Sequence, residues 1–190
     1  VSIRHTGQSL FGKRVLDYGC GYGRVIRLLY YYTDPENIVG TDSWDLSLDH
    51  CRNDGLLGTL VKTEAVPAVK PCEPVDIAYS FSVLTHTSEE STRAILRAIH
   101  SVIPRGGIYV TSIRPIEFWE RINKKTPVAL KALENAHRTR GYAFVPNKDM
   151  EHYGNTTMQA DFLAGPDWNI VGIERSLVDP VQLVVTLQAP

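Results

Sequence analysis

The stretch VLDYGCGYGR, residues 15–24, decides the fold. Its first four residues favour a buried β-strand, and glycines follow at every second position, Gly19, Gly21 and Gly23. An acid, Asp17, stands two residues before the first of them. Glycine tolerates backbone conformations that other residues avoid, and it leaves bare backbone against which a ligand can lie. The stretch therefore predicts a ligand-binding turn directly after the first strand of a sheet.

The spacing of these glycines separates two kinds of cofactor site. The dinucleotide-binding turn has the spacing GxGxxG, with a pyrophosphate at the N-terminus of the following helix. Here the spacing is GxGxG, and Arg24 stands where the last glycine of the dinucleotide pattern would fall. An NAD-dependent oxidoreductase is therefore disfavoured.

Length, composition and charge are those of one ordinary globular domain. The chain has 190 residues, of which 43% are hydrophobic and 22% charged. Lys and Arg number 20 against 21 Asp and Glu, which argues against nucleic acid or a membrane surface as a partner. The sequence shows no apolar run long enough to span a membrane and no secretory signal.

The three cysteines, Cys20, Cys51 and Cys72, lie far apart in the sequence and form no CxxC pair. We therefore expect neither a disulfide framework nor a zinc or other metal site, and we expect a reducing, cytoplasmic location. The sequence begins with Val1 rather than Met, which leaves open that it is part of a larger chain. A homodimer is left open as well.

Strand and helix patterns alternate up to residue 113. Strands are expected in 13–18, 37–41, 58–63, 74–84 and 108–113, and helices in 22–33, 45–55 and 87–102. Two further strands, joined by a turn at Asp179-Pro180, close the chain. This order predicts an α/β fold, with a doubly wound, mostly parallel, seven-stranded sheet, an antiparallel C-terminal hairpin strand and helices on both faces.

Residues 115–165 break this alternation. We predict a helical insertion there that covers the ligand cleft, within a single domain of residues 1–190. Its clearest helix has Thr126 as its cap, Pro127 at its first position and Gly141 at its end. The helix before the fifth strand is expected to begin with a capping box, Thr87 with Glu90 three residues on.

Four segments resemble the motifs of class I, Rossmann-like S-adenosylmethionine-dependent methyltransferases of the small-molecule type. They are VLDYGCGYGR, NIVGTD at 37–42, DIAYSFSVLTH at 76–86 and IPRGGIYVTS at 103–112. The resemblance runs from about residue 11 to residue 190. It implies that S-adenosylmethionine is the cofactor.

The resemblance also implies roles for single residues. The glycine loop would cradle the methionine part of the cofactor, with Asp17 holding its amino group. Asp42, which follows Asp17 by 25 residues, would accept hydrogen bonds from the ribose hydroxyls. The alternative for Asp42 is a cap of the next helix. The implied cofactor-binding residues are Asp17, Gly19, Cys20, Gly21, Tyr22, Gly23, Asp42, Ser43, Ser80 and Phe81.

One position departs from the family pattern. The family often has an acid for the adenine amino group after the third strand, where this sequence has Lys62. The nearest acid, Glu64, stands two places on. Backbone groups would then hold the adenine.

Methyl transfer mainly requires that donor and acceptor be held in line, so the family has no universal catalytic residue. His86 is the candidate base, because its ordinary pKa suits proton transfer near neutrality. The alternative is a histidine that packs at the start of the next helix. Tyr153 and Trp119, with the neighbouring Phe118, are candidates for an acceptor pocket, against the alternatives of a polar loop and core packing. We expect these side chains to surround one cleft.

The sequence thus predicts an enzyme that transfers a methyl group from S-adenosylmethionine to an oxygen or nitrogen atom of a small-molecule acceptor. The alternative is a methyltransferase-like domain without catalysis. Such a domain would act as a scaffold or as the cofactor-sensing part of a larger protein.

Overall fold

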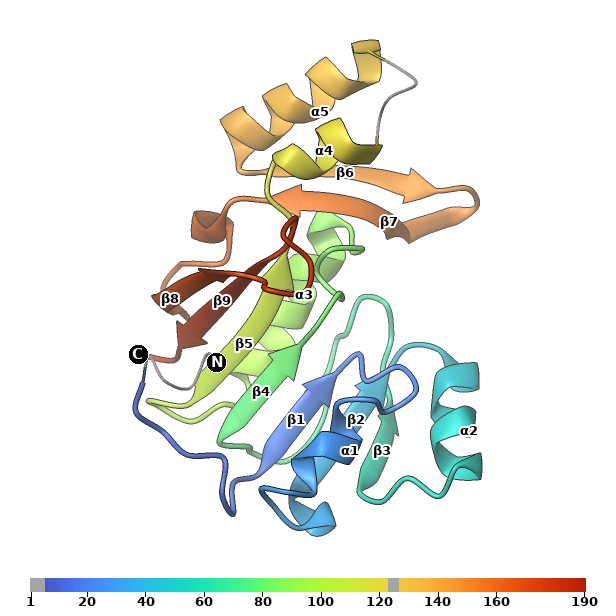
Figure 1. The fold of residues 1–190 in the computed structure, drawn as a ribbon, viewed down its shortest axis with the longest axis vertical. Helices are drawn as coiled ribbons and strands as arrows, with labels where there is room; N and C mark the ends of the chain where they lie inside the picture. Colours follow the sequence, from blue (N-terminus) through green and yellow to red (C-terminus); the bar gives the residue numbers. More distant parts are fainter. Residues whose placement is uncertain (1–5, 123–126) are drawn as a thin grey trace.

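A computed structural model describes residues 6–122 and 127–190, and within them the main sheet has seven strands (Figure 1). Their order is β3-β2-β1-β4-β5-β9-β8. The strands are β1 (Val15–Tyr18), β2 (Ile38–Asp42), β3 (Thr59–Lys62), β4 (Ile77–Ser80), β5 (Ile108–Ile113), β8 (Asn169–Arg175) and β9 (Leu183–Gln188). Strands β1 to β5 are parallel, and β9 runs antiparallel to both β5 and β8. The predicted fold class is confirmed.

The order of the strands creates the place for a ligand. Strand β1 pairs with β2 on one side and with β4 on the other, so the chain reverses direction across the sheet at β1. Crevices open at such a switch point, outside the carboxyl ends of the strands. The glycine loop that follows Tyr18 lies at this point (Figure 1).

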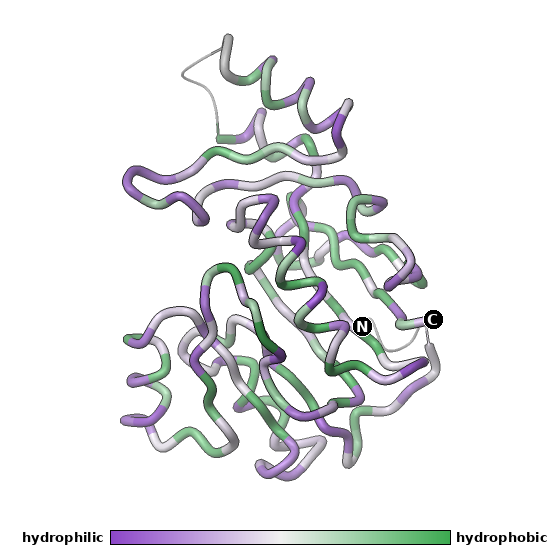
Figure 2. The backbone as a smooth tube through the Cα atoms, turned by 180° about the vertical axis from the view of Figure 1, so that it is seen from behind, coloured by the Kyte–Doolittle hydropathy of each residue, from purple (hydrophilic) through white to green (hydrophobic). Residues whose placement is uncertain are grey.

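Helices cover both faces of the sheet. They are α1 (Ile26–Leu29), α2 (Asp45–Asn53) and α3 (Glu89–His100), with a short 3-10 turn η2 (Pro35–Asn37) before β2. Alternate strand residues belong to opposite layers: Leu16 packs in one cluster with Ile95 and Ile99 of α3, and Val15 in another with Ile26 of α1. Figures 1 and 2 show α3 crossing the face of the sheet opposite to α1.

The insertion between β5 and β8 is only partly helical. Helices α4 (Glu117–Ile122) and α5 (Pro127–Arg140) are followed by the hairpin β6 (Tyr142–Asn147) and β7 (Met150–Met158) and by the 3-10 turn η3 (Ala160–Phe162). This corrects the expectation of a helical insertion over 115–165. Pro146 and Gly154, which weaken a strand pattern, face each other in the hairpin, and the register shifts beside Pro146. The predicted cap Thr126 lies outside the described residues.

The hairpin is hydrogen-bonded to the segment that follows β4. The amide of Gly154 donates to His86 O at 2.8 Å, that of Thr156 to Thr85 O at 3.0 Å, and that of Ser88 to His152 O at 3.1 Å. Residues 85–88 therefore act as a third strand beside β7. The hairpin is held across the end of the sheet, as Figure 1 shows.

Helix α3 begins one residue later than the sequence predicts. The N-cap is Ser88, whose hydroxyl accepts from Ser91 N at 3.2 Å. Thr87 instead binds the hairpin: its carbonyl accepts hydrogen bonds from the hydroxyls of Tyr142 on β6 and Thr156 on β7. The helix ends expected at Gly55 and Gly141 agree with the structure, and both glycines have positive φ. The first helix is shorter than predicted, since α1 spans only Ile26–Leu29 of the expected 22–33.

None of the helices in the described part of the chain has the length and hydropathy required to span a bilayer.

Candidate active site

A cleft of ≈ 380 Å³ opens at the carboxyl ends of β1, β2 and β4, below the β6–β7 hairpin. Its walls come from several segments that lie far apart in the sequence. The lining residues are Asp17, Tyr18, Gly19, Cys20, Gly21, Tyr22, Arg24, Val25, Asp42, Ser43, Trp44, Ser47, Thr63, Glu64, Ala65, Phe81, Ser82, Val83, Thr87, Ile95, His152 and Tyr153. Most of the cofactor-binding residues expected from the sequence, and Tyr153, are brought together here.

The glycine loop leaves room that side chains would fill. Gly19 has a φ of 76°, and a Cβ placed on it would lie 2.3 Å from Cγ2 of Val83. Gly21 has a φ of 53°, with no atom near its Cβ position, and its amide donates to the carboxylate of Asp42 at 2.8 Å. A side chain at position 19 would clash with Val83, and the positive φ favours glycine at both positions, so the loop presents bare backbone to the cleft.

Asp42 joins the glycine loop to the start of α2. Its Oδ2 accepts from Gly21 N at 2.8 Å, and its Oδ1 accepts from Trp44 N at 2.9 Å. Each oxygen uses one of its acceptor positions in these bonds, so the carboxylate can accept further hydrogen bonds from a ligand. The two sequence-based alternatives, ligand contact and helix cap, are compatible in this geometry.

Asp17 lies at the floor of the cleft and is only 3% exposed. Its Oδ2 is buried without a hydrogen-bond partner among the described residues. Burial raises the pKa of Asp17 to about 7, the hydroxyl of Tyr79 on β4 lowers it, and the charge of Asp42 raises it further. A buried acid of this kind is costly unless a ligand supplies a donor, and a cationic donor fits best.

Two aromatic rings narrow the cleft from opposite sides. The rings of Trp44, at the start of α2, and Tyr153, on β7, have centroids 5.5 Å apart. Tyr153 also stacks on His86, with ring centroids 5.2 Å apart and planes 13° from parallel. Because the hairpin is fixed to residues 85–88, Tyr153 is held beside the cleft.

His86 lies behind Tyr153 and does not line the cleft. Its Nδ1 is 2.7 Å from Gly154 O, which can only accept, so Nδ1 carries the proton. Its Nε2 then accepts from Nη2 of Arg114 at 3.0 Å. Burial and the charge of Arg114 lower the pKa of His86. The ring as placed is neutral, and neither nitrogen has a free lone pair for a substrate proton.

Trp119 lies away from the cleft, contrary to the expectation. Its side chain is 1% exposed, packs against Phe118 in the insertion, and donates from Nε1 to Oγ1 of Thr157 at 2.7 Å. Arg114 lies over the ring of Phe118, 4.1 Å from its centroid, and covers that side chain as well. Trp119 and Phe118 therefore form the core of the insertion.

Ser80 and Gly23 also do not line the cleft. Ser80 is fully buried, and its hydroxyl lies 2.7 Å from the hydroxyl of Tyr109 and 2.9 Å from that of Thr111. These contacts place Ser80 in the packed interior between β4 and β5. A Cβ on Gly23 would lie 2.7 Å from Cδ2 of Leu56, so this glycine is needed for packing.

Several cleft residues were not predicted from the sequence. Trp44 directly follows Asp42 and Ser43 in the sequence, and this place beside the acid expected to bind the ligand was a readable signal. Glu64 lines the cleft, whereas Lys62 pairs with Asp45 at 2.7 Å. Thr87 and Ile95 had no local signal. Within residues 6–122 and 127–190, no cluster of three side chains suited to a metal ion is found.

Comparisons with known proteins agree with this geometry. Residues 15–107 match the methyltransferase domain family. No curated protein matches the sequence. An S-adenosylmethionine-dependent methyltransferase from Mesorhizobium loti superposes with a TM-score of 0.70 at 19% identity, over 98% of this chain and 95% of its own.

Two further solved structures have the same fold. A SAM-dependent methyltransferase from Methanosarcina mazei superposes with a TM-score of 0.64 at 13% identity, over 100% of this chain and 97% of its own. The magnesium protoporphyrin IX methyltransferase of Synechocystis was solved with bound S-adenosylhomocysteine. It superposes with a TM-score of 0.62 at 16% identity, over 99% of this chain and 78% of its own. In its matched domain sequence, its strand order and its glycine-loop cleft, this chain is similar to the class I, Rossmann-like S-adenosylmethionine-dependent methyltransferases.

Proposed function

We propose that this enzyme transfers the methyl group of S-adenosylmethionine to an oxygen or nitrogen atom of a small-molecule acceptor. The observation that carries the proposal is the cleft floor, where the buried Oδ2 of Asp17 lacks a partner directly beside the open glycine loop. A cofactor with an amino-acid group supplies the missing cationic donor.

The residues of the cleft fit the parts of this cofactor. Asp17 would hold the ammonium group, and the backbone of the glycine loop would lie along the methionine part. Asp42, oriented by Gly21 and Trp44, keeps acceptor positions for the ribose hydroxyls. Glu64, which lines the cleft, would accept from the adenine amino group.

The cofactor supplies a methyl carbon activated by positively charged sulfur. The chain contributes binding and orientation, which can account for a large part of the rate of an in-line transfer. An acceptor hydroxyl or amine must also lose a proton. His86, with both nitrogens engaged, fits a role in holding Tyr153 better than that of the base.

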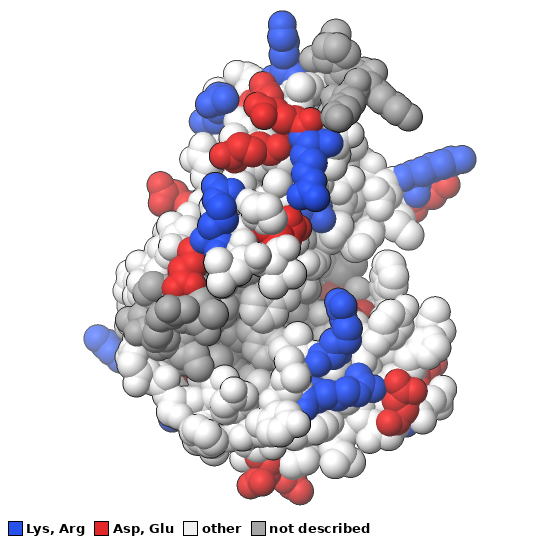
Figure 3. Space-filling view, in the orientation of Figure 1, with Lys and Arg blue, Asp and Glu red and all other residues white. Residues whose placement is uncertain are grey.

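The shape and charge of the surface favour a small acceptor. The hairpin β6–β7 lies across the end of the sheet, and the Tyr153–Trp44 contact restricts the cleft beneath it. In Figure 3, positive and negative side chains are interspersed over this face rather than gathered into a basic patch. A long nucleic acid would need such a patch.

The class of acceptor can be tested with cofactor labelled in its methyl group. The protein is incubated with a cell extract divided into a small-molecule fraction and a macromolecular fraction, and the Asp17→Asn variant is the control. We expect label in the small-molecule fraction with the wild type only. Label in the protein or RNA of the macromolecular fraction would contradict the proposed acceptor class, and absence of label from both fractions would favour the non-catalytic alternative.

A further inference from the structure

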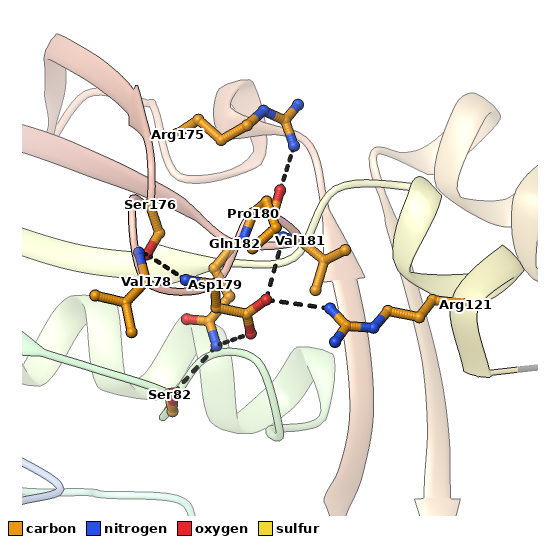
Figure 4. Close-up of polar contacts among 9 residues, drawn as sticks. All are labelled: Ser82, Arg121, Arg175, Ser176, Val178, Asp179, Pro180, Val181 and Gln182. Atoms are coloured by element: carbon orange, nitrogen blue, oxygen red, sulfur yellow. Dashed lines mark hydrogen bonds and ion pairs between the residues drawn. The ribbon is translucent and has the colours of Figure 1, made fainter.

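The turn between β8 and β9, residues 176–182, lies at the same edge of the sheet as the cleft. Strands β8 and β5 both run antiparallel to β9, so the carboxyl end of β8 is level with the carboxyl ends of β4 and β5. Gln182 links the turn to the cleft, since its Nε2 donates to Oγ of Ser82 at 3.4 Å (Figure 4). Ser82 lines the cleft and has a φ of 60°, which turns the chain after β4.

The turn is fixed by its own polar groups, as Figure 4 shows. Asp179 accepts from Val181 N at 3.2 Å, from Arg121 of α4 at 3.3 Å and from Gln182 Nε2 at 3.2 Å. Ser176 Oγ accepts from the amides of Val178 at 3.3 Å and Asp179 at 3.1 Å. A turn with this many internal hydrogen bonds holds its backbone in a defined conformation.

Two aliphatic side chains stand at the tip of this fixed turn. Leu177 and Val178 are each 96% exposed. In Figure 4, Val178 points to the side of the turn on which Gln182 and Ser82 lie. Beyond Ser82, the cleft-lining ring of Phe81 is also partly exposed, which extends an apolar surface from the cleft.

The charged side chains around the tip of the turn are already paired within the protein. Asp179 and Arg121 form an ion pair and neutralise each other. Arg175 donates to the carbonyl of Pro180 and points away from Ser82 in Figure 4. A polar or charged group of an acceptor would therefore find no free partner at Leu177 and Val178, whereas an apolar group would bury both side chains.

From this arrangement we infer that the 176–182 turn is one wall of the acceptor site and that Leu177 and Val178 bind an apolar group of the acceptor. The inference rests on the proposed function and deepens it, because it names an acceptor with a hydrocarbon or aromatic part. The reacting oxygen or nitrogen atom would lie toward Ser82 and the cofactor, with the apolar part under the turn.

The test uses phenol, 4-ethylphenol and 4-butylphenol as probes, with the protein saturated with S-adenosylhomocysteine. Dissociation constants are measured by NMR titration of the leucine and valine methyl groups. We expect the methyl signals of Leu177 and Val178 to shift with each probe. Affinity should rise about 3- to 4-fold per added methylene, the fold-change that corresponds to ~0.8 kcal/mol per buried CH₂.

In the variant Leu177→Asp/Val178→Asp, the affinity for the probe should rise much less as the alkyl group of the phenol is lengthened. The control is Leu57→Asp, which places the same charge on an exposed leucine at the amino-terminal end of β3, the opposite edge of the sheet, and should keep the gain. An unchanged gain in the double variant overturns the inference. Shifts at Leu177 and Val178 no larger than those at Leu57 also overturn it.

Two other outcomes are separated by measurements on the same samples. If the double substitution changes the sedimentation coefficient, the two side chains form a contact between copies of the chain, and the inference is overturned. Binding of S-adenosylhomocysteine is measured first on every variant. Its absence in the wild type contradicts the proposed function, whereas normal binding with no effect of the turn contradicts only the inference about the acceptor.

Discussion

The two acids of the cleft have different environments, and the difference defines their roles. Asp42 is half-buried and already accepts two backbone hydrogen bonds. Asp17 is buried, has an oxygen without a partner, and has its pKa raised to about 7 from 3.8. Asp17 therefore has an oxygen that is free to bind a ligand, whereas Asp42 also holds the loop together.

Substitution of Asp17 by Asn is expected to remove the pH dependence of cofactor binding. In the wild type, binding of the cofactor ammonium requires the carboxylate form, so affinity for S-adenosylhomocysteine should fall about tenfold from pH 8 to pH 6. Calorimetry at the two pH values measures this. An equal pH dependence in Asp17→Asn would show that another group titrates.

The same raised pKa makes a prediction for the free protein. An acid whose pKa is higher in the folded state than in the unfolded state costs stability as pH rises between the two values. For Asp17 this interval runs from 3.8 to about 7. Denaturant unfolding should therefore show that Asp17→Asn is more stable, relative to the wild type, at pH 8 than at pH 4. A constant difference would contradict the assignment.

Substitution of Asp42 by Ala is expected to weaken S-adenosylhomocysteine binding by about 1–3 kcal/mol, the cost of leaving polar groups without a charged partner. The control is Asp54→Ala, which removes an exposed acid that pairs with Arg27 at 3.1 Å outside the cleft. Calorimetry should detect no loss for the control. Equal affinities for the two variants would leave Asp42 with the helix-capping role alone.

At the scale of elements, the β6–β7 hairpin is hydrogen-bonded to residues 85–88, and this pairing positions Tyr153 beside Trp44 in the cleft. The backbone bonds from Gly154, Thr156 and Ser88 fix the hairpin, and His86 lies beneath Tyr153. His86 thus joins three elements: the loop after β4, the end of β5 through Arg114, and β7 through Gly154.

The variant His86→Gln separates positioning from proton transfer. The amide of Gln can donate to Gly154 O and accept from Arg114, as the neutral imidazole does. We expect methyl transfer within about tenfold of the wild-type rate, because loss of a general base typically costs 10²–10⁴. A larger loss in kcat, with S-adenosylhomocysteine binding unchanged, would assign His86 the role of base.

Gly154 tests the structure of the hairpin itself. A Cβ at this position would lie 2.0 Å from Val145 O, a backbone atom of the paired strand. Gly154→Ala is therefore expected to destabilise the protein by about 1–3 kcal/mol in denaturant unfolding. Gly165→Ala is the control, because its Cβ position is open, and it should be neutral or slightly stabilising. Equal stability of the two variants would contradict this hairpin register.

The comparison with the sequence shows which elements local patterns can define. The fifth strand was predicted at its observed bounds, because a run rich in β-branched and aromatic residues follows the helix-ending stretch Pro-Arg-Gly-Gly at residues 104–107. The fourth strand was predicted too long, since Phe81 and Ser82 leave the sheet to line the cleft. The hairpin was missed because its pairing, and not its residue types, stabilises it.

The site was predictable only where its residues are close in the sequence. The glycine loop and Asp42 follow consecutive strands, so topology alone brings them together. The hydrogen-bond partners of His86 are Arg114 and Gly154, which lie 28 and 68 positions away in the sequence. No local sequence pattern predicts these contacts. Core packing was the sequence-based alternative for Trp119, but its hydrogen-bond partner Thr157 lies 38 positions away and could not be read from its spacing.

At the scale of the whole molecule, one end of the sheet carries every segment assigned to function. The glycine loop, the residues after β2 and β4, the hairpin and the 176–182 turn all meet at the carboxyl edge (Figure 1). The opposite edge holds the turns that close the helices. A protein built in this way uses the sheet as a rigid support and its loops for recognition.

The central claim is that this cleft binds S-adenosylmethionine, and titration calorimetry with S-adenosylhomocysteine at pH 8 tests it most directly. We predict saturable binding with one molecule per chain in the wild type, a large loss in Asp17→Asn, and no binding of NAD under the same conditions. Absence of binding to the folded wild-type protein at millimolar S-adenosylhomocysteine would contradict the account.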